Sequence, residues 1–263
     1  MVKSVEEVHI WTISSPGLVL WDIDNTLVST TDYDRHAYRT VVKRLTGRDA
    51  AALPPSGAGR SEHATLRELL RANGVTGTDL DRLLPDATAL LRRLLTRDPA
   101  GMRAAGRVLP GAPEAMEAVA RLTGAVGVAT GNLREVARAK LRAFGLDHLV
   151  DWRLSGCAED GATKTQLVRH VQRNAARLGL GSFSRRTTVL IGDARTDAAA
   201  GGDGAAAVLG VTTGRTDREA LKAAGADLVL ADLSDTAAVV AAVRRLLTAS
   251  GQHPSERPSG LPA

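Results

Sequence analysis

The sequence predicts an α/β fold, in which a doubly wound, Rossmann-like parallel sheet is interrupted by an inserted all-helical domain. From Pro110 onward, short apolar runs alternate with stretches of helical periodicity, which is typical of a parallel sheet with helices on both faces. Between residues 30 and 105, apolar residues recur only at helical spacing. With 263 residues, the chain is long enough for one sizeable α/β domain and a smaller unit.

The first strand of the sheet is expected at residues 18–22, where a bounded apolar run follows Pro16 and Gly17. The other elements of the sheet domain are expected in alternation along the chain. The strands cover residues 125–130, the neighbourhood of Trp152, and residues 187–191, 206–211 and 228–230, and the helices cover residues 133–144, 165–178, 217–224 and 235–247.

The insertion is expected to contain three helices, at residues 32–46, 61–72 and 79–97, each with leucine or valine on one face. The sheet domain would then consist of residues 1–29 and 106–249, and the helical domain of residues 30–105. Residues 250–263 are rich in Pro, Ser and Gly and lack apolar periodicity. A disordered tail is therefore expected there.

The composition of the chain indicates which class of protein and which binding partners to expect. The chain has 44% hydrophobic and 24% charged residues and a formal charge of +5, which is ordinary for a soluble globular protein. The arginines are scattered between acidic residues, so we expect no nucleic-acid binding. No apolar run approaches a membrane span and the first ten residues do not resemble a signal peptide. We expect a cytoplasmic protein without membrane contact, and the sequence leaves its oligomeric state open.

Polar side chains follow three of the predicted strands at the point where each strand ends. In an open parallel sheet, the ligand site lies at this carboxyl edge. Several carboxylates brought together there repel one another unless a divalent cation or a basic side chain neutralises them. The residues concerned are Asp22, Asp24, Thr130, Gly131, Asn132, Asp193 and Asp197.

Each of these features has a structural interpretation when it is taken alone. The segment from Asp22 to Thr26 could be a turn capped by its own side chains, Asn132 and Asp197 could cap helices, and Lys164 could be a solvated lysine. However, Lys164 falls near the start of a predicted helix, where a cation is disfavoured by roughly 0.3–1 kcal/mol. The coincidence of acidic residues after successive strands favours a functional site.

Four short motifs in order carry a resemblance to a known family. They are Asp22-Ile23-Asp24-Asn25-Thr26 after an apolar strand, Val128-Ala129-Thr130, Lys164, and Gly192-Asp193 followed by Asp197. The chain resembles the haloacid dehalogenase-like superfamily over residues 18 to about 247. Further stretches, such as Gly210 to Gly214, resemble its phosphoglycolate phosphatase-like branch, which has a helical cap. Lys164 is followed by threonine, whereas the family often has proline there.

This resemblance implies a Mg²⁺-dependent phosphatase. Asp22 would attack phosphorus and form an aspartyl-phosphate, and Asp24 would protonate the departing alcohol and then activate water. Lys164 would neutralise the nucleophile and the phosphoryl group. Mg²⁺ would bind Asp22, the Asp24 carbonyl and Asp193, with Asp197 as an auxiliary ligand.

The resemblance also implies where the substrate binds. Thr130 and the backbone amides of the segment that opens the next helix, including Gly131 and Asn132, would hold phosphate oxygens. The helical insertion would be a cap that closes over the site. Arg60, in a glycine-rich loop of this insertion, would contact the substrate, although a solvent-exposed arginine is the alternative.

The leading hypothesis is therefore hydrolysis of a small-molecule phosphate ester. The second acid, Asp24, argues against halide displacement, since the dehalogenases of the superfamily do not use it. Two alternatives stay open: a sugar-phosphate phosphomutase, and a non-catalytic phosphate-binding regulatory module. The sequence does not identify the phosphate ester.

Overall fold

The computed structural model describes residues 17–55 and 59–248. The expected tail at 250–263 and the first 16 residues of the expected sheet domain lie outside the described residues. Within the described ranges, the helices are too short or too polar to cross a membrane.

The centre of the molecule is a parallel sheet of five strands in the order β4-β1-β5-β6-β7. These strands are β1 (Leu18–Trp21), β4 (Ala125–Val128), β5 (Thr188–Gly192), β6 (Ala207–Val211) and β7 (Leu228–Leu230). All four neighbouring pairs are parallel. The doubly wound α/β fold predicted from the sequence is confirmed.

Helices cover both faces of this sheet because alternate residues of each strand point to opposite faces. Val19 and Trp21 belong to one buried apolar cluster, and Leu18 and Leu20 belong to another. The helices on the first face are α5 (Ala112–Thr123), α6 (Arg134–Ala143) and α10 (Thr236–Thr248), those on the second are α7 (Lys164–Arg177) and α8 (Arg195–Gly202), and α9 (Arg218–Ala223) packs beside β7. The strands are therefore buried on both sides.

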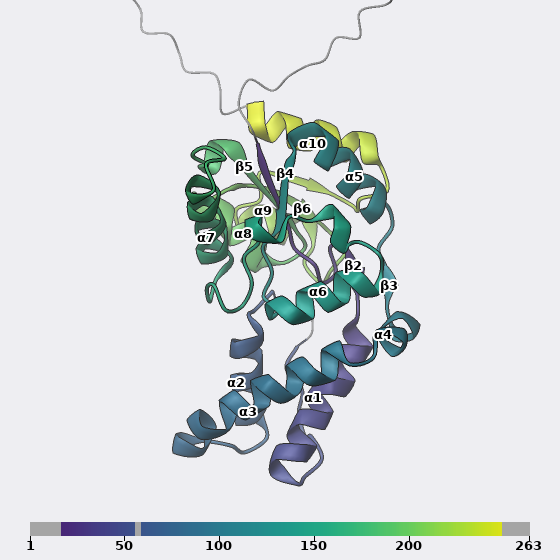
Figure 1. Cartoon of the computed structure of the whole chain (residues 1–263), viewed down its shortest axis with the longest axis vertical. Coiled ribbons are helices and arrows are strands. Elements are labelled where there is room, and N and C mark those ends of the chain that lie inside the picture. Colours follow the sequence, from purple (N-terminus) through teal and green to yellow (C-terminus); the bar gives the residue numbers. More distant parts are fainter. Residues whose placement is uncertain (1–16, 56–58, 249–263) are drawn as a thin grey trace, which may run out of the picture.

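Four helices of the described residues lie between positions 30 and 106, and Figure 1 shows them together at one end of the molecule. They are α1 (Thr31–Thr46), α2 (Glu62–Ala72), α3 (Gly77–Thr96) and α4 (Pro99–Ala105). Their apolar faces share a buried cluster that also includes Leu133 and Val136 of the α6 region. The helical unit thus rests on α6, and its status as a separate domain with boundaries at 30 and 105 stays a prediction.

A short antiparallel ribbon joins the two parts of the chain. It pairs β2 (Val28–Ser29) with β3 (Arg107–Val108). The chain therefore leaves the sheet and returns to it at the same place. Two-residue strands have no periodicity that the sequence could reveal, and this ribbon was not predicted.

The strand expected near Trp152 is wrong. Residues Trp152–Leu154 form a 3₁₀ helix, η2, whose N-terminus is capped by the Asp151 side chain accepting from the Arg153 amide at 2.9 Å. The Leu154 carbonyl then lies over β4 so closely that a Cβ on Gly127 would be 1.7 Å from it. Two further 3₁₀ helices are η1 (Asp147–Leu149) and η3 (Arg185–Thr187).

Candidate active site

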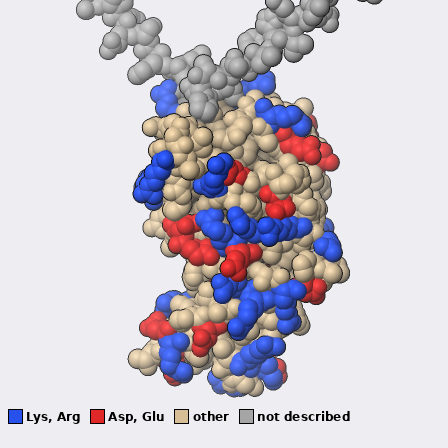
Figure 2. Space-filling model, viewed as in Figure 1, with Lys and Arg blue, Asp and Glu red and all other residues tan. Residues whose placement is uncertain are grey.

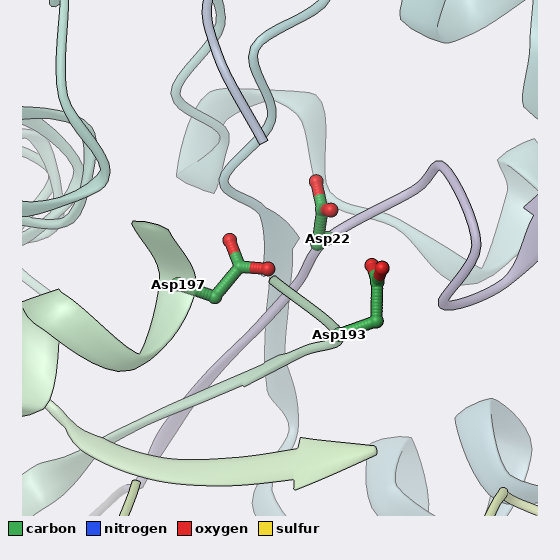
Figure 3. Close-up of side chains that lie close together, drawn as sticks. All are labelled: Asp22, Asp193 and Asp197. Carbon is green, nitrogen blue, oxygen red and sulfur yellow. The ribbon is translucent and has the colours of Figure 1, made fainter. Parts of the chain in front are cut away.

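Three buried aspartates converge at the carboxyl edge of the sheet. One oxygen from each of Asp22, Asp193 and Asp197 lies within 4.8 Å of the others. Asp22 and Asp193 are brought together because they follow the adjacent strands β1 and β5, whose Trp21 and Ile191 are in register. Figure 3 shows Asp197 reaching toward the same space from the first turn of α8.

Lys164 lies at the first position of α7 and is almost completely buried against these acids. Its Nζ is 2.6 Å from Asp22 Oδ1 and 2.7 Å from Asp197 Oδ1, and it donates to the Ala129 carbonyl at 2.7 Å. Burial opposes its charge, but Asp197 and Asp22 outweigh burial and raise the pKa of Lys164 above its usual value. The lysine is therefore a fixed cation inside the acidic cluster.

One lysine does not neutralise the whole cluster. Burial, opposed by Lys164, raises the pKa of Asp22 to about 7. Burial together with the charges of Asp197 and Asp22 raises the pKa of Asp193 to about 9. A further cation would relieve this repulsion between the carboxylates.

The surroundings of Asp193 fit such a cation. Thr26 donates to its Oδ1 at 3.1 Å, whereas the buried Oδ2 has no hydrogen-bond partner within the described ranges. A Cβ on Gly214 would lie 1.8 Å from this Oδ2, so the glycine keeps space beside it. Carboxylate oxygens are the ligands that Mg²⁺ prefers, and the donor set therefore fits Mg²⁺.

The Asp24 side chain is held apart from the three-aspartate cluster. Its Oδ1 accepts from Lys140 Nζ at 2.7 Å, and its Oδ2 accepts from Asn132 Nδ2 at 2.7 Å. A tight turn follows, with Asn25 at a φ of 58° and its amide bonded to the Val28 carbonyl. Both carboxylate oxygens of Asp24 are thus bonded to core side chains.

Thr130, Gly131 and Asn132 follow β4 and line the same cavity as Asp22 and Asp24. The Asn132 amide and side chain both donate to Thr130 Oγ1, at 3.2 and 2.8 Å. The Gly131 carbonyl accepts from the Glu62 amide of α2 at 2.7 Å, which joins this loop to the helical unit.

Two amides that open α6 are already occupied. The Leu133 amide donates to Glu62 Oε2 at 2.6 Å, and the Arg134 amide donates to the Glu159 carboxylate at 3.0 Å. The Leu133 and Arg134 amides are thus bonded to carboxylates in this structure, and phosphate binding by Thr130, Gly131 and Asn132 stays a prediction.

A cavity of about 100 Å³ lies between the sheet edge and the helical unit. Arg60 lines it, as expected, but about half of its side chain is exposed and its guanidinium is paired with Glu68 on α2. The side chains lining the cavity come from both units and include Asp22, Asp24, Thr130, Asn132, Lys140 and Asp193 from the sheet side, and Asp34, Arg35, Tyr38, Arg60 and Glu62 from the helical side.

Three charged residues that line this cavity, two of them buried and one half-buried, were not identified as site residues from the sequence. They are Lys140 on α6, Asp34 on α1 and Glu62 on α2. Lys140 falls on the same helical face as Val136, Ala137 and Leu141, which are all buried. A lysine within the apolar stripe of a helix was the signal that could have identified it.

Comparisons with known proteins agree with this architecture. Residues 16–204 match the model of the haloacid dehalogenase-like hydrolase family. No curated protein sequence matches the chain.

Three solved structures with the same fold match this chain over nearly the whole of their own length. A hydrolase from Pseudomonas syringae has a TM-score of 0.63 and 19% identity, and the match covers 86% of this chain and 98% of that one. A predicted phosphoglycolate phosphatase from Haemophilus somnus has a TM-score of 0.63, 17% identity and coverage of 86% and 99%. A putative beta-phosphoglucomutase from Thermotoga maritima has a TM-score of 0.55, 19% identity and coverage of 86% and 99%. With the family model matched over most of its length, the chain belongs to the haloacid dehalogenase-like hydrolase family.

Proposed function

We propose that this protein is a Mg²⁺-dependent phosphatase that hydrolyses a small-molecule phosphomonoester through an aspartyl-phosphate on Asp22. The observation that carries the proposal is the arrangement of Lys164 between Asp22 and Asp197, at 2.6 and 2.7 Å, with Asp193 beside them. A carboxylate nucleophile needs a neighbouring cation when it approaches an anionic phosphate, since the two otherwise repel each other.

Two displacement steps account for the reaction. In the first, an Asp22 oxygen attacks phosphorus, the P–O bond to the alcohol breaks, and the alcohol oxygen takes a proton from Asp24. In the second, Asp24 accepts a proton from water, the water oxygen attacks phosphorus, and inorganic phosphate leaves Asp22. Asp24 follows the nucleophile by two residues and lines the same cavity, which supports this division of work.

Asp22, Asp193 and the Asp24 carbonyl would hold Mg²⁺, with Asp197 as an auxiliary ligand. Bound there, the ion would supply charge neutralisation to the phosphoryl oxygens. Lys164 would keep the nucleophile oriented. Thr130 and the Gly131 amide would bind the phosphate oxygens that point away from the acids.

The cavity supports a small substrate. Its volume of about 100 Å³ leaves room for a compact leaving group beneath the helical unit. Figure 2 shows basic side chains on both parts of the molecule, with acidic ones among them. Arg60, at the cavity wall, would contact the leaving group.

A phosphomutase is the second candidate function, since one of the structures with the same fold is a putative beta-phosphoglucomutase. It would transfer the phosphoryl group of Asp22 back to a sugar phosphate instead of to water. Activation by a sugar bisphosphate would distinguish it from a phosphatase.

The test is a screen of the purified protein with Mg²⁺ against a panel of metabolite phosphates and one aryl phosphate, with released phosphate as the readout. We expect turnover of several small phosphomonoesters and none with Asp22→Asn. Equal phosphate release by Asp22→Asn would contradict the proposal, as would the absence of turnover on the entire panel.

A further inference from the structure

Lys140 is a buried cation that the proposed reaction does not use. It lies on α6 with a relative exposure of 1%, and its Nζ donates to Asp24 Oδ1 at 2.7 Å and to Asp34 Oδ2 at 2.9 Å. Its neighbours on the same helical face, Val136 and Leu141, are apolar and fully buried. An apolar side chain would therefore fit this position in the helix.

Stability alone does not explain this lysine. Removing an ammonium group from water is costly, and buried ion pairs are often no more stabilising than well-packed apolar side chains of similar size. The lysine is kept in its charged form by three carboxyl groups around it, those of Asp24, Asp34 and Glu62, which outweigh burial and raise its pKa. A function in orienting one of these groups accounts for its presence.

The orientation of Asp24 is determined by two contacts. Lys140 holds its Oδ1 from α6, and Asn132 holds its Oδ2 from the loop after β4. Two donors on different oxygens fix the plane of a carboxylate, whereas one donor would leave it free to rotate. Lys140 and Asn132 therefore act together as a clamp on Asp24.

The clamp also reaches the helical unit. Asp34 lies in the first turn of α1, shortly after the ribbon strand β2, and it binds the same ammonium group as Asp24. Thr30 donates to Asp34 Oδ2 at 3.0 Å and lies 3.5 Å from Asp24 Oδ1. Asp34 is thus a second anchor, in the inserted segment, for the lysine that holds Asp24.

We propose that Lys140 is a positioning residue that fixes the Asp24 carboxylate for proton transfer and is itself anchored to the inserted helices by Asp34. This inference rests on the proposed function, because it assigns Asp24 the transfer of a proton to the leaving group. In this account Lys140 contacts the Asp24 carboxylate and no atom of the substrate, so it acts through Asp24.

The kinetic test compares an alkyl phosphate with an aryl phosphate in the Lys140→Met variant. An alkoxide needs a proton to depart and a nitrophenolate does not, so a misplaced Asp24 should slow phosphorylation by the alkyl ester selectively. We expect single-turnover rates to fall on the order of tenfold more for the alkyl ester than for the aryl ester. The double variant Lys140→Met/Asp34→Asn removes a positive and a negative charge together, and it should show the same selectivity if the single variant does not fold.

Leu141→Ala is the matched control, because Leu141 is the next residue of α6 and is fully buried. Its apolar side chain donates no hydrogen bond to Asp24. It should lower the melting temperature while leaving the alkyl-to-aryl rate ratio unchanged. Equal slowing of both esters by the Lys140 variants, or the same ratio change in Leu141→Ala, would overturn the proposal.

A crystallographic comparison separates this inference from the proposed function. In the double variant we expect the Asp24 carboxylate to leave the position seen in wild type while β1 and α6 stay in place. An Asp24 that keeps its orientation through Asn132 alone would overturn the clamp. If wild type hydrolyses no phosphomonoester, the proposed function fails, and this structural comparison still decides whether Lys140 positions Asp24.

Discussion

The two carboxylate oxygens of Asp193 have different neighbours, and one of these neighbours is Gly214. Oδ1 accepts from Thr26, and Oδ2 lies next to Gly214, where a Cβ would be 1.8 Å away. Gly214→Ala should therefore displace the carboxylate that we assign to Mg²⁺ binding. We expect the Mg²⁺ concentration for half-maximal phosphate release to rise on the order of tenfold or more, as when a metal site loses its supporting contacts.

Gly202→Ala is the matched control for this substitution. A Cβ at Gly202 would have its nearest contact at 3.6 Å, with the Ala224 carbonyl, which is an ordinary separation. Magnesium titrations of both variants, with melting temperatures measured in parallel, decide the question. If the Gly214 variant has an unchanged Mg²⁺ dependence, Asp193 does not bind the metal through Oδ2.

At the scale of elements, helix α6 is connected to the helical unit at its start and near its end. Glu62 of α2 accepts from the Leu133 amide at 2.6 Å before the first turn, and Lys140 in its last turns binds Asp34 of α1. Apolar contacts of Leu133 and Val136 lie between these two polar links. The position of α6 is therefore coupled to that of α1 and α2.

The buried Glu62 predicts a pH dependence of stability. Burial, opposed by Lys140 and the Leu133 amide, raises its pKa to about 8. Because the pKa is higher in the folded than in the unfolded state, this contribution to stability is complete below about pH 4.3 and is lost as the pH rises toward 8. The free energy of unfolding of wild type should therefore fall between about pH 5 and pH 8. We expect Glu62→Gln, which keeps an acceptor for the Leu133 amide, to reduce this fall by roughly 1–3 kcal/mol.

Denaturant unfolding at several pH values measures this effect, and Glu114→Gln, which removes a solvent-exposed carboxyl on α5, controls for the lost charge. Parallel pH profiles for wild type and the Glu62 variant would show that Glu62 does not titrate in this range in the folded protein.

The molecule consists of a sheet and a helical unit, and we expect the sheet edge to transfer the phosphoryl group and the helical unit to select the substrate. The groups assigned to phosphoryl transfer lie on the sheet edge, whereas Arg60 lies in the helical segment and reaches the cavity from the other side. Arg60→Ala should change the ranking of metabolite phosphates in kcat/KM and leave slow hydrolysis of an aryl phosphate within about twofold of wild type. Equal losses on every substrate would place Arg60 among the groups that act on the phosphoryl group itself.

Metal removal affects the whole molecule as well as its activity. Chelation should abolish turnover, because the acidic cluster then repels the substrate phosphate. It should also lower the melting temperature, since Mg²⁺ that binds the folded state stabilises it by mass action. Thermal unfolding and phosphate release with EDTA, and after restoration of Mg²⁺, test both expectations. Full activity in excess EDTA would contradict the metal assignment.

The sequence predicted the sheet and most helices because their signals are local. The run Leu18 to Trp21 is apolar and bounded, and the leucines of α3 recur at helical spacing. Helix α4 was missed, since its seven residues bury a single apolar side chain, Met102. The ribbon of β2 and β3 was missed because its two-residue strands are specified by pairing across the chain.

The candidate site was predictable only in part. Asp22, Asp193 and Lys164 follow or open regular elements, so the fold brings them together once the strand order is known. The contacts of Asp24 with Lys140 and of Glu62 with Leu133 join residues 116 and 71 positions apart. The first pair depends on how α6 packs beside the turn after β1, and the second on how the inserted helix α2 packs on the start of α6. No local sequence pattern encodes either arrangement.

The central claim is that Asp22 carries the phosphoryl group, and trapping the intermediate tests it most directly. In Asp24→Asn the nucleophile is intact, but the base that activates water is absent, so the intermediate should form from an aryl phosphate and then accumulate. Rapid quench followed by peptide mass spectrometry should find one phosphate on Asp22 in this variant and none in Asp22→Asn. A phosphate on a different residue, or no phosphorylated peptide from a variant that still releases nitrophenol, would contradict the account.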